Sequence, residues 1–246
     1  MAITNENKEK ILHNNAEISR LLAENETILR EEGFNPPEKN YVIPNKNERI
    51  NFPNKYVRTK RYFVSKYSMN EIILNDEVVS NIAYTLQMSD MNNYIMNRFN
   101  TFASIDAMIH KQSCLTIISV IEALVQGSIN NVRKGCQECN EQSCKYRISK
   151  REKEHVYSAL KKWSEMELIQ LTDNELKQVD ELFELRNKIH LVSSNSNEMM
   201  NGTFGLAKYN VAIMMLKRID EELIGHIVPL YGKCMKKEKE PQGLTF

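Results

Sequence analysis

The stretch CLTIISVIEALVQG, residues 114–127, is dense in large apolar side chains and indicates the class of fold. Around it, apolar residues recur at helical spacing over residues 103–133, which predicts one long helix. They are Ile105, Ile109, Leu115, Ile118, Val120, Ile121, Leu124 and Val125. Glu122 interrupts this run, and we expect it to be a partly exposed helix residue.

Three further helices are predicted after this stretch. One spans residues 150–169, with apolar positions at Val156, Leu160, Trp163 and Leu168. The next spans 172–192 and opens with the capping-box pattern of Thr172 and Glu175. The last spans 204–233. Four sizeable helices with short connections predict an all-α protein built on an antiparallel four-helix bundle.

The chain is predicted to have two parts, an N-terminal helical accessory region over 1–100 and the bundle over 101–246. Its low content of turn-forming residues, eight glycines and six prolines, suits a helical protein. Four of the prolines, Pro36, Pro37, Pro44 and Pro53, fall within 33–55, which predicts a linker or an extended arm.

Residues 5–32 precede this linker and read as a polar amphipathic helix. Ile11, Ile18, Leu21 and Ile28 follow heptad spacing, with Asn25 at an inner position. A helix of this length is marginal alone, so another surface must support it. We favour docking on its own domain over an intermolecular coiled coil.

The segment YVRTKRYFVSKY, residues 56–67, mixes basic and aromatic side chains. Cations for phosphates and rings for base stacking are what single-stranded RNA binding requires, so Arg58, Lys60 and Arg61 are candidate RNA-binding residues. The simpler interpretation, which we favour, is a short strand or edge segment with its basic residues in solvent. Ser68 and Glu71 then predict a capped helix start, and helical residues continue with breaks to about residue 100.

Net charge, hydropathy and the motifs that are missing argue against several classes of function. The net charge of +1 provides no bulk attraction to nucleic acid, so any such binding must come from local patches. Neither a signal peptide nor a membrane span is indicated, which predicts a cytoplasmic protein with no membrane partner. Glycine-rich phosphate loops and the G-x-S-x-G and H-E-x-x-H motifs are absent from the sequence. Their absence argues against nucleotide hydrolysis, serine hydrolases and zinc proteases.

A cysteine cluster, GCQECNEQSC, places Cys136, Cys139 and Cys144 in the connection 134–148. In a cytosolic chain, a C-x-x-C turn can share a tetrahedral zinc ion between two thiolates, so a structural zinc site is one interpretation. Reduced, incidental cysteines and a redox pair are the alternatives. The candidates for a fourth ligand are His155, Cys114, Cys234 or a residue of another protomer.

Arg186, Asn187 and His190 are the candidate catalytic residues, on the helix predicted over 172–192. On a helical wheel the expected core stripe is Leu182, Leu185, Ile189 and Val192. The trio lies nearly opposite, beside a second apolar strip of Leu176, Val179 and Phe183. We therefore expect a second protomer to cover that strip and to place the trio in a cleft. The alternative is that Arg186 and His190 are ordinary surface or helix-end residues.

The sequence ELRNKIHL, residues 184–191, on the third of four helices resembles the motif of the HEPN superfamily, in which an arginine is followed by a polar residue and then a histidine. SVIEALVQG, residues 119–127, is similar in texture to the matching helix of these domains. The resemblance covers roughly 100–233. Three residues separate Arg186 and His190 here, whereas the common form of the motif has four to six.

The resemblance implies a metal-independent endoribonuclease that dimerises through the 174–192 helix and uses the ribose 2′-hydroxyl as nucleophile. His190 would be the general acid and base, Arg186 would bind the phosphate, and Asn187 would orient the histidine. Such domains serve in prokaryotic antiviral defence, abortive infection and toxin systems, which implies RNA as substrate and an antitoxin, sensor or other defence protein as partner. The short spacer favours one alternative, a non-catalytic HEPN-like RNA-binding or regulatory module. A zinc-stabilised interaction protein is a third.

Overall fold

The computed structural model describes residues 3–33, 47, 49–51, 56–138, 143–148, 155–187 and 204–236. Throughout these residues the regular secondary structure is helical and no strand occurs, which confirms the all-α class. The chain divides into two compact units, Met1–Phe52 and Pro53–Phe246. The packing boundary thus falls earlier than the boundary near residue 100 expected from sequence.

The first unit contains helix α1, Asn5–Glu31, as predicted over 5–32. The Thr4 side chain caps it by accepting a hydrogen bond from the Asn7 N–H at 3.4 Å. Arg20 forms ion pairs with Glu17 at 2.8 Å and with Glu24 at 2.9 Å along the same helix. No side chain of α1 is buried. Within the first unit, its large apolar side chains are therefore exposed, except Leu29, which is half-buried.

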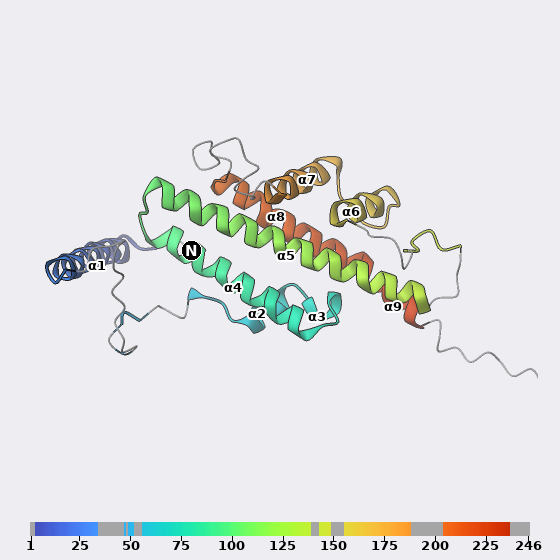
Figure 1. Cartoon of the computed structure of the whole chain (residues 1–246), viewed down its shortest axis with the longest axis horizontal. Helices are drawn as coiled ribbons and strands as arrows, with labels where there is room; N and C mark the ends of the chain where they lie inside the picture. Colours follow the sequence, from blue (N-terminus) through green and yellow to red (C-terminus); the bar gives the residue numbers. More distant parts are fainter. Residues whose placement is uncertain are drawn as a thin grey trace, which may run out of the picture. The chain divides into compact units, whose positions relative to one another are not determined.

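The second unit is organised around helix α5, Ala103–Glu138. Helices α4, Asp76–Arg98, and α8, Leu206–Glu222, pack along it (Figure 1). Helix α8 continues through a π-helical turn, η3, Leu223–Ile227, into α9, Val228–Lys236. The apolar stretch quoted first forms the core of this unit, where Ile117, Ile118, Ile121 and Leu124 are fully buried.

Helices α6, Val156–Glu165, and α7, Asp173–Asn187, complete the second unit. They pack against each other and both contact α5, while α7 also contacts α8 (Figure 1). The four helices predicted after residue 100 thus occur as α5, α6, α7 and the continuous α8–η3–α9. Because α4 packs along α5 as well, part of the predicted accessory region belongs to this unit.

Two local predictions before α4 were wrong. Residues Lys60–Lys66 form helix α2 rather than a strand, and Thr59 caps it by accepting from the Tyr62 N–H. Ser68 does not cap helix α3, Met69–Ile72, because its backbone is left-handed with φ 40 and its side chain makes no cap bond. The cap that starts α4 is Asn75, which accepts from Glu77 and Val78.

Helix α5 is long and apolar enough over Ser104–Gln137 to cross a membrane by length and composition. In the structure, 61% of its most apolar window is buried against the protein's own helices. Its apolar surface is therefore used mainly in the core of the second unit.

Gly127 on α5 lies where helix α3 approaches most closely. A Cβ atom added there would stand 2.7 Å from Ile73 Cγ1 and 3.2 Å from the Ile72 carbonyl oxygen. The same carbonyl accepts a hydrogen bond from Asn131 Nδ2 at 2.7 Å, which fixes the end of α3 on α5. The absence of a side chain at residue 127 therefore allows this contact.

We expect Gly127→Ala to destabilise the second unit by about 1–3 kcal/mol, because overpacking outweighs the helix propensity of alanine. Chemical denaturation measures the change. Gly232→Ala in α9 is the matched control, since nothing lies within 4 Å of its added Cβ. The control should be neutral or stabilising; equal effects of the two substitutions would contradict the packing argument.

Candidate functional site

The start of helix α7 is fixed by the predicted capping box. The Thr172 N–H donates to Glu175 Oε2 at 2.8 Å, and the Glu175 N–H donates to Thr172 Oγ1 at 3.3 Å. Burial alone would raise the pKa of Glu175, but hydrogen bonds from Thr172 and Arg218 outweigh burial and lower that pKa. The sequence prediction of this helix start is confirmed.

Arg218 connects the start of α7 to α8. Its Nε donates to Glu175 Oε1 at 3.1 Å, and its terminal nitrogens bond Glu222 and the Gln170 carbonyl oxygen. Glu222 is buried and also accepts from the Gln170 N–H at 2.6 Å. This network fixes the position of α7, and therefore of the residues at its end.

The inner face of α7 is broader than the expected core stripe. Leu176, Val179, Leu182 and Leu185 are all buried within the chain. Of the strip that we expected a second protomer to cover, Leu176 and Val179 are thus covered by this chain's own helices, and Phe183 is partly buried against the same core. The argument for a dimer from an uncovered strip was therefore wrong for Leu176 and Val179. On a helical wheel the buried residues of α7 form one continuous face about half a turn wide, whereas the sequence analysis expected two separate stripes on opposite sides. Arg186 falls within that span.

Arg186 contacts Glu122 on α5 through two nitrogens. Its NH1 donates to Glu122 Oε1 at 3.0 Å, and its NH2 lies 2.8 Å from Oε2. The side chains are 39% and 33% exposed, so the pair lies at the surface rather than in the core. A guanidinium has more N–H donors than these two bonds use, so it can still donate to a phosphate oxygen from another edge.

The ion pair between Glu122 and Arg186 was not predicted from the sequence. Glu122 was expected to be a partly exposed helix residue, and its exposure agrees with that expectation. One feature of the sequence could have predicted this ion pair: Glu122 is a carboxylate within an apolar helical run. A charge in such a position is costly unless a cation from a neighbouring helix pairs with it. Helix α7 supplies that cation.

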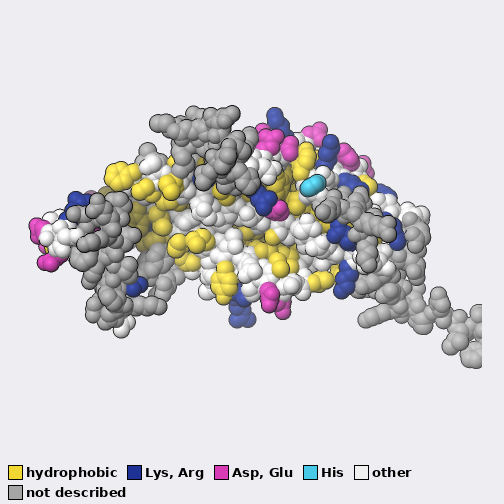
Figure 2. Space-filling view, in the orientation of Figure 1, with side chains coloured by type: hydrophobic (Ala, Val, Ile, Leu, Met, Phe, Trp, Pro, Cys, Tyr) yellow, Lys and Arg dark blue, Asp and Glu magenta, His cyan; other side chains and the backbone are white. Residues whose placement is uncertain are grey.

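Of the two other residues of the trio, the structure describes Asn187 but not His190. Asn187 is the last residue of α7 and is exposed. His190 lies outside the described residues, as do Ile189 and Val192. On the face seen in Figure 2, acidic and basic side chains are interspersed over α6 and α7. The visible part of this surface therefore carries no continuous field of one sign.

Two of the three candidate RNA-binding residues have partners within the protein. Arg58 donates from its backbone N–H and its Nε to Asp90 Oδ2, at 2.9 and 2.7 Å, and this carboxylate raises the pKa of Arg58. Lys60 donates to Ser80 Oγ at 2.6 Å and lies over the Tyr84 ring. These contacts give both residues a structural role.

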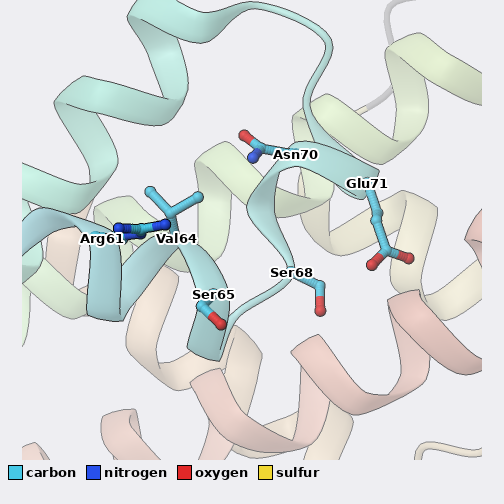
Figure 3. A pocket seen from close by; sticks show the side chains of 6 residues that line it. All are labelled: Arg61, Val64, Ser65, Ser68, Asn70 and Glu71. Atoms are coloured by element: carbon cyan, nitrogen blue, oxygen red, sulfur yellow. The ribbon is translucent and has the colours of Figure 1, made fainter.

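Arg61 lines a shallow pocket between α2 and α3, together with Ser65, Ser68, Asn70 and Glu71 (Figure 3). Arg61 and Ser65 come from α2, whereas Asn70 and Glu71 come from α3. The pocket combines one cation with one carboxylate and several neutral polar groups. RNA contact through the basic segment therefore stays a prediction that depends mainly on Arg61.

The cysteine cluster is described in part. Cys136 is buried, and its Sγ accepts a hydrogen bond from the Ile148 N–H at 3.4 Å. Cys144 is half-buried, and Cys139 lies outside the described residues. Among the side chains that the structure describes, no group of three or more potential metal ligands comes together. The zinc site stays a prediction.

Comparisons with protein-family models, with curated proteins and with solved structures gave no match to this chain. The assignment of a function therefore depends on the residues themselves and on the motif at the end of α7.

Proposed function

We propose that the second unit is a HEPN-type endoribonuclease that cleaves RNA without a metal ion. The observation that carries this proposal is the half-exposed Arg186 guanidinium, held by Glu122 at the end of α7, four residues before His190. A fixed guanidinium fork matches phosphate oxygens, and an imidazole transfers protons near neutral pH. Both groups that the reaction needs thus lie within five consecutive residues of the sequence.

The proposed reaction needs no external nucleophile. His190 takes the proton of the ribose 2′-hydroxyl, and the 2′-oxygen forms a bond to phosphorus as the bond to the 5′-oxygen breaks. The departing 5′-oxygen receives a proton from the imidazolium form of His190, which leaves a 2′,3′-cyclic phosphate and a 5′-hydroxyl and returns the imidazole to its neutral form. Arg186 stabilises the negative charge on the phosphoryl oxygens, and Glu122 keeps the guanidinium in place. Asn187 orients the histidine.

The remaining parts of the proposal follow from the resemblance. A homodimer through the 174–192 segment would bring two Arg/His pairs into one groove. Because Leu176 and Val179 are buried in their own chain, the contact must use the C-terminal end of α7, where Arg186 is half-buried and Asn187 is exposed. A cytoplasmic role in antiviral defence or a toxin system, with an antitoxin or sensor as partner, completes this proposal.

We expect the purified protein to cleave single-stranded RNA in the presence of EDTA and to leave 2′,3′-cyclic phosphate ends. The matched substrate carries one 2′-deoxynucleotide at the cleavage position and should resist cleavage there, since it lacks the nucleophile. End-group analysis of the products measures both. Binding of RNA without cleavage of either substrate would instead favour the non-catalytic RNA-binding module.

We also propose that Cys136, Cys139 and Cys144 bind a structural zinc ion. The Cys136 sulfur accepts a hydrogen bond from the Ile148 N–H, which brings the chain just after Cys144 close to the C-x-x-C turn. Burial, in contrast, raises the pKa of Cys114 to about 11, so that thiol stays protonated at neutral pH and is a poor ligand.

Elemental analysis of the protein purified without chelator is expected to find one zinc per chain. Cys136→Ser should release the metal, and Cys114→Ser, the matched control, should retain it. Zinc-free parent protein, or equal zinc in both variants, would contradict this site. Neither result bears on RNA cleavage, because the proposed reaction uses no metal.

A further inference from the structure

Helix α1 exposes a line of large apolar side chains. Ile11, Ile18, Leu21 and Ile28 are between 45 and 52% exposed. They occupy inner positions of one heptad register, and the two other inner positions within it are asparagines, Asn14 and Asn25. We call this set of residues the α1 seam: Ile11, Asn14, Ile18, Leu21, Asn25 and Ile28.

The α1 seam is complementary to itself when two copies run in opposite directions. In the register centred between residues 19 and 20, Ile18 faces Leu21 of the partner subunit, and Ile11 faces Ile28 of the partner subunit. The same register places Asn14 opposite Asn25 of the partner subunit. Apolar residues therefore meet apolar residues, and each amide meets an amide, which is the device that fixes register in coiled coils. An in-register parallel pair would match the seam in the same way, so the flanking charges decide the orientation.

Charges beside the seam also match in this orientation. Lys10 stands opposite Glu31 of the partner subunit on the flanking position. Glu17 stands opposite Glu24 of the partner subunit, and Arg20, which pairs with both glutamates within each helix, reduces this repulsion. The attraction that favours this orientation therefore comes from Lys10 and Glu31. In a parallel pair, Lys10 would face an asparagine and Glu17 a leucine, so no opposite charges would meet.

From this complementarity we infer that α1 forms an antiparallel two-stranded coiled coil with α1 of a second copy of the chain. A helix of 27 residues is about 40 Å long, which accommodates the whole seam. Burial of the seam supplies the stabilisation that a single exposed helix lacks. This interface is independent of the proposed ribonuclease activity and of the proposed contact through α7.

The first experiment measures self-association of the full chain by sedimentation velocity over a range of concentrations. We expect Ile18→Asp combined with Leu21→Asp to weaken the α1 association by about 100-fold or more, because buried, unpaired carboxylates are costly. Leu12→Asp is the matched control: Leu12 is 58% exposed but lies outside the seam. The inference is overturned if the double variant associates like the parent, or if Leu12→Asp weakens association as much.

The second experiment tests orientation. Lys10→Glu should weaken association by about 5-fold, since two ion pairs become repulsive, and adding Glu31→Lys in the same chain should restore it. A parallel coiled coil predicts no effect of either change, and that result would overturn the antiparallel arrangement. RNA cleavage assays on the same variants separate this outcome from failure of the proposed function.

Discussion

Replacing His190 by alanine is expected to lower the rate of RNA cleavage by about 10²- to 10⁴-fold, which is the usual contribution of a general acid–base residue. We expect the variant to fold like the parent, which its circular dichroism spectrum checks. Single-turnover cleavage of a labelled RNA measures the rate. His155→Ala is the matched control: that histidine precedes α6 and its side chain makes no cap bond.

Arg186 variants sharpen the same test. Arg186→Ala should reduce the cleavage rate strongly. The free energy of unfolding should change by about 1 kcal/mol or less, because the ion pair with Glu122 lies at the surface and is partly exposed to solvent. Arg186→Lys keeps the charge but cannot make bidentate hydrogen bonds to a phosphate. Compared with Arg186→Ala, it should therefore recover more of the RNA affinity than of the cleavage rate. Parental rates in both His190→Ala and Arg186→Ala would exclude this site as the catalytic centre.

Replacing Trp163 by alanine is expected to destabilise the second unit by about 3–5 kcal/mol, the usual cost of removing a large buried aromatic side chain. Trp163 is 2% exposed. Its carbonyl oxygen accepts the Leu168 N–H at 2.8 Å in the turn that ends α6, where Glu167 has a left-handed φ of 55. The residue thus links packing of α6 to the chain path into α7.

Thermal unfolding should show this loss as a decrease in Tm of about 10 °C. Trp163→Phe should cost less, since it retains a ring in the same site. Phe102→Ala is the surface control, because Phe102 is 80% exposed and its removal leaves no cavity. If Trp163→Ala and Phe102→Ala lower Tm equally, Trp163 is not the packing centre of α6.

Sequence periodicity predicted the long helices well because their apolar faces are repeated over many turns. The Thr172–Glu175 cap was also predictable, since its bonds join residues three apart in the chain. Helix α2 was missed because its seven residues are too short to show a period. The Arg58–Asp90 bond just before it and its own Lys60–Ser80 bond are made with α4, which lies 20 or more residues later in the sequence. Local pattern carries no information about such partners.

The candidate site shows the same limit. Arg186 was identified from its spacing to His190, but the wheel placed it on a separate face because it assumed one narrow core stripe. Helix α7 is instead buried on a broad face by α5, α6 and α8 together. The Arg186–Glu122 contact joins residues 64 positions apart, so only the packing of α7 on α5 could reveal it.

The Arg186–Glu122 pair has a consequence for how ionic strength acts on the protein. A bare cation that neutralises a phosphate releases condensed counterions from RNA, so its contribution to binding decreases as salt is added. Arg186 already has a carboxylate partner, and the two together carry no net charge. Its contact with RNA should therefore depend little on salt concentration, whereas a contact made by Arg61 should weaken steeply.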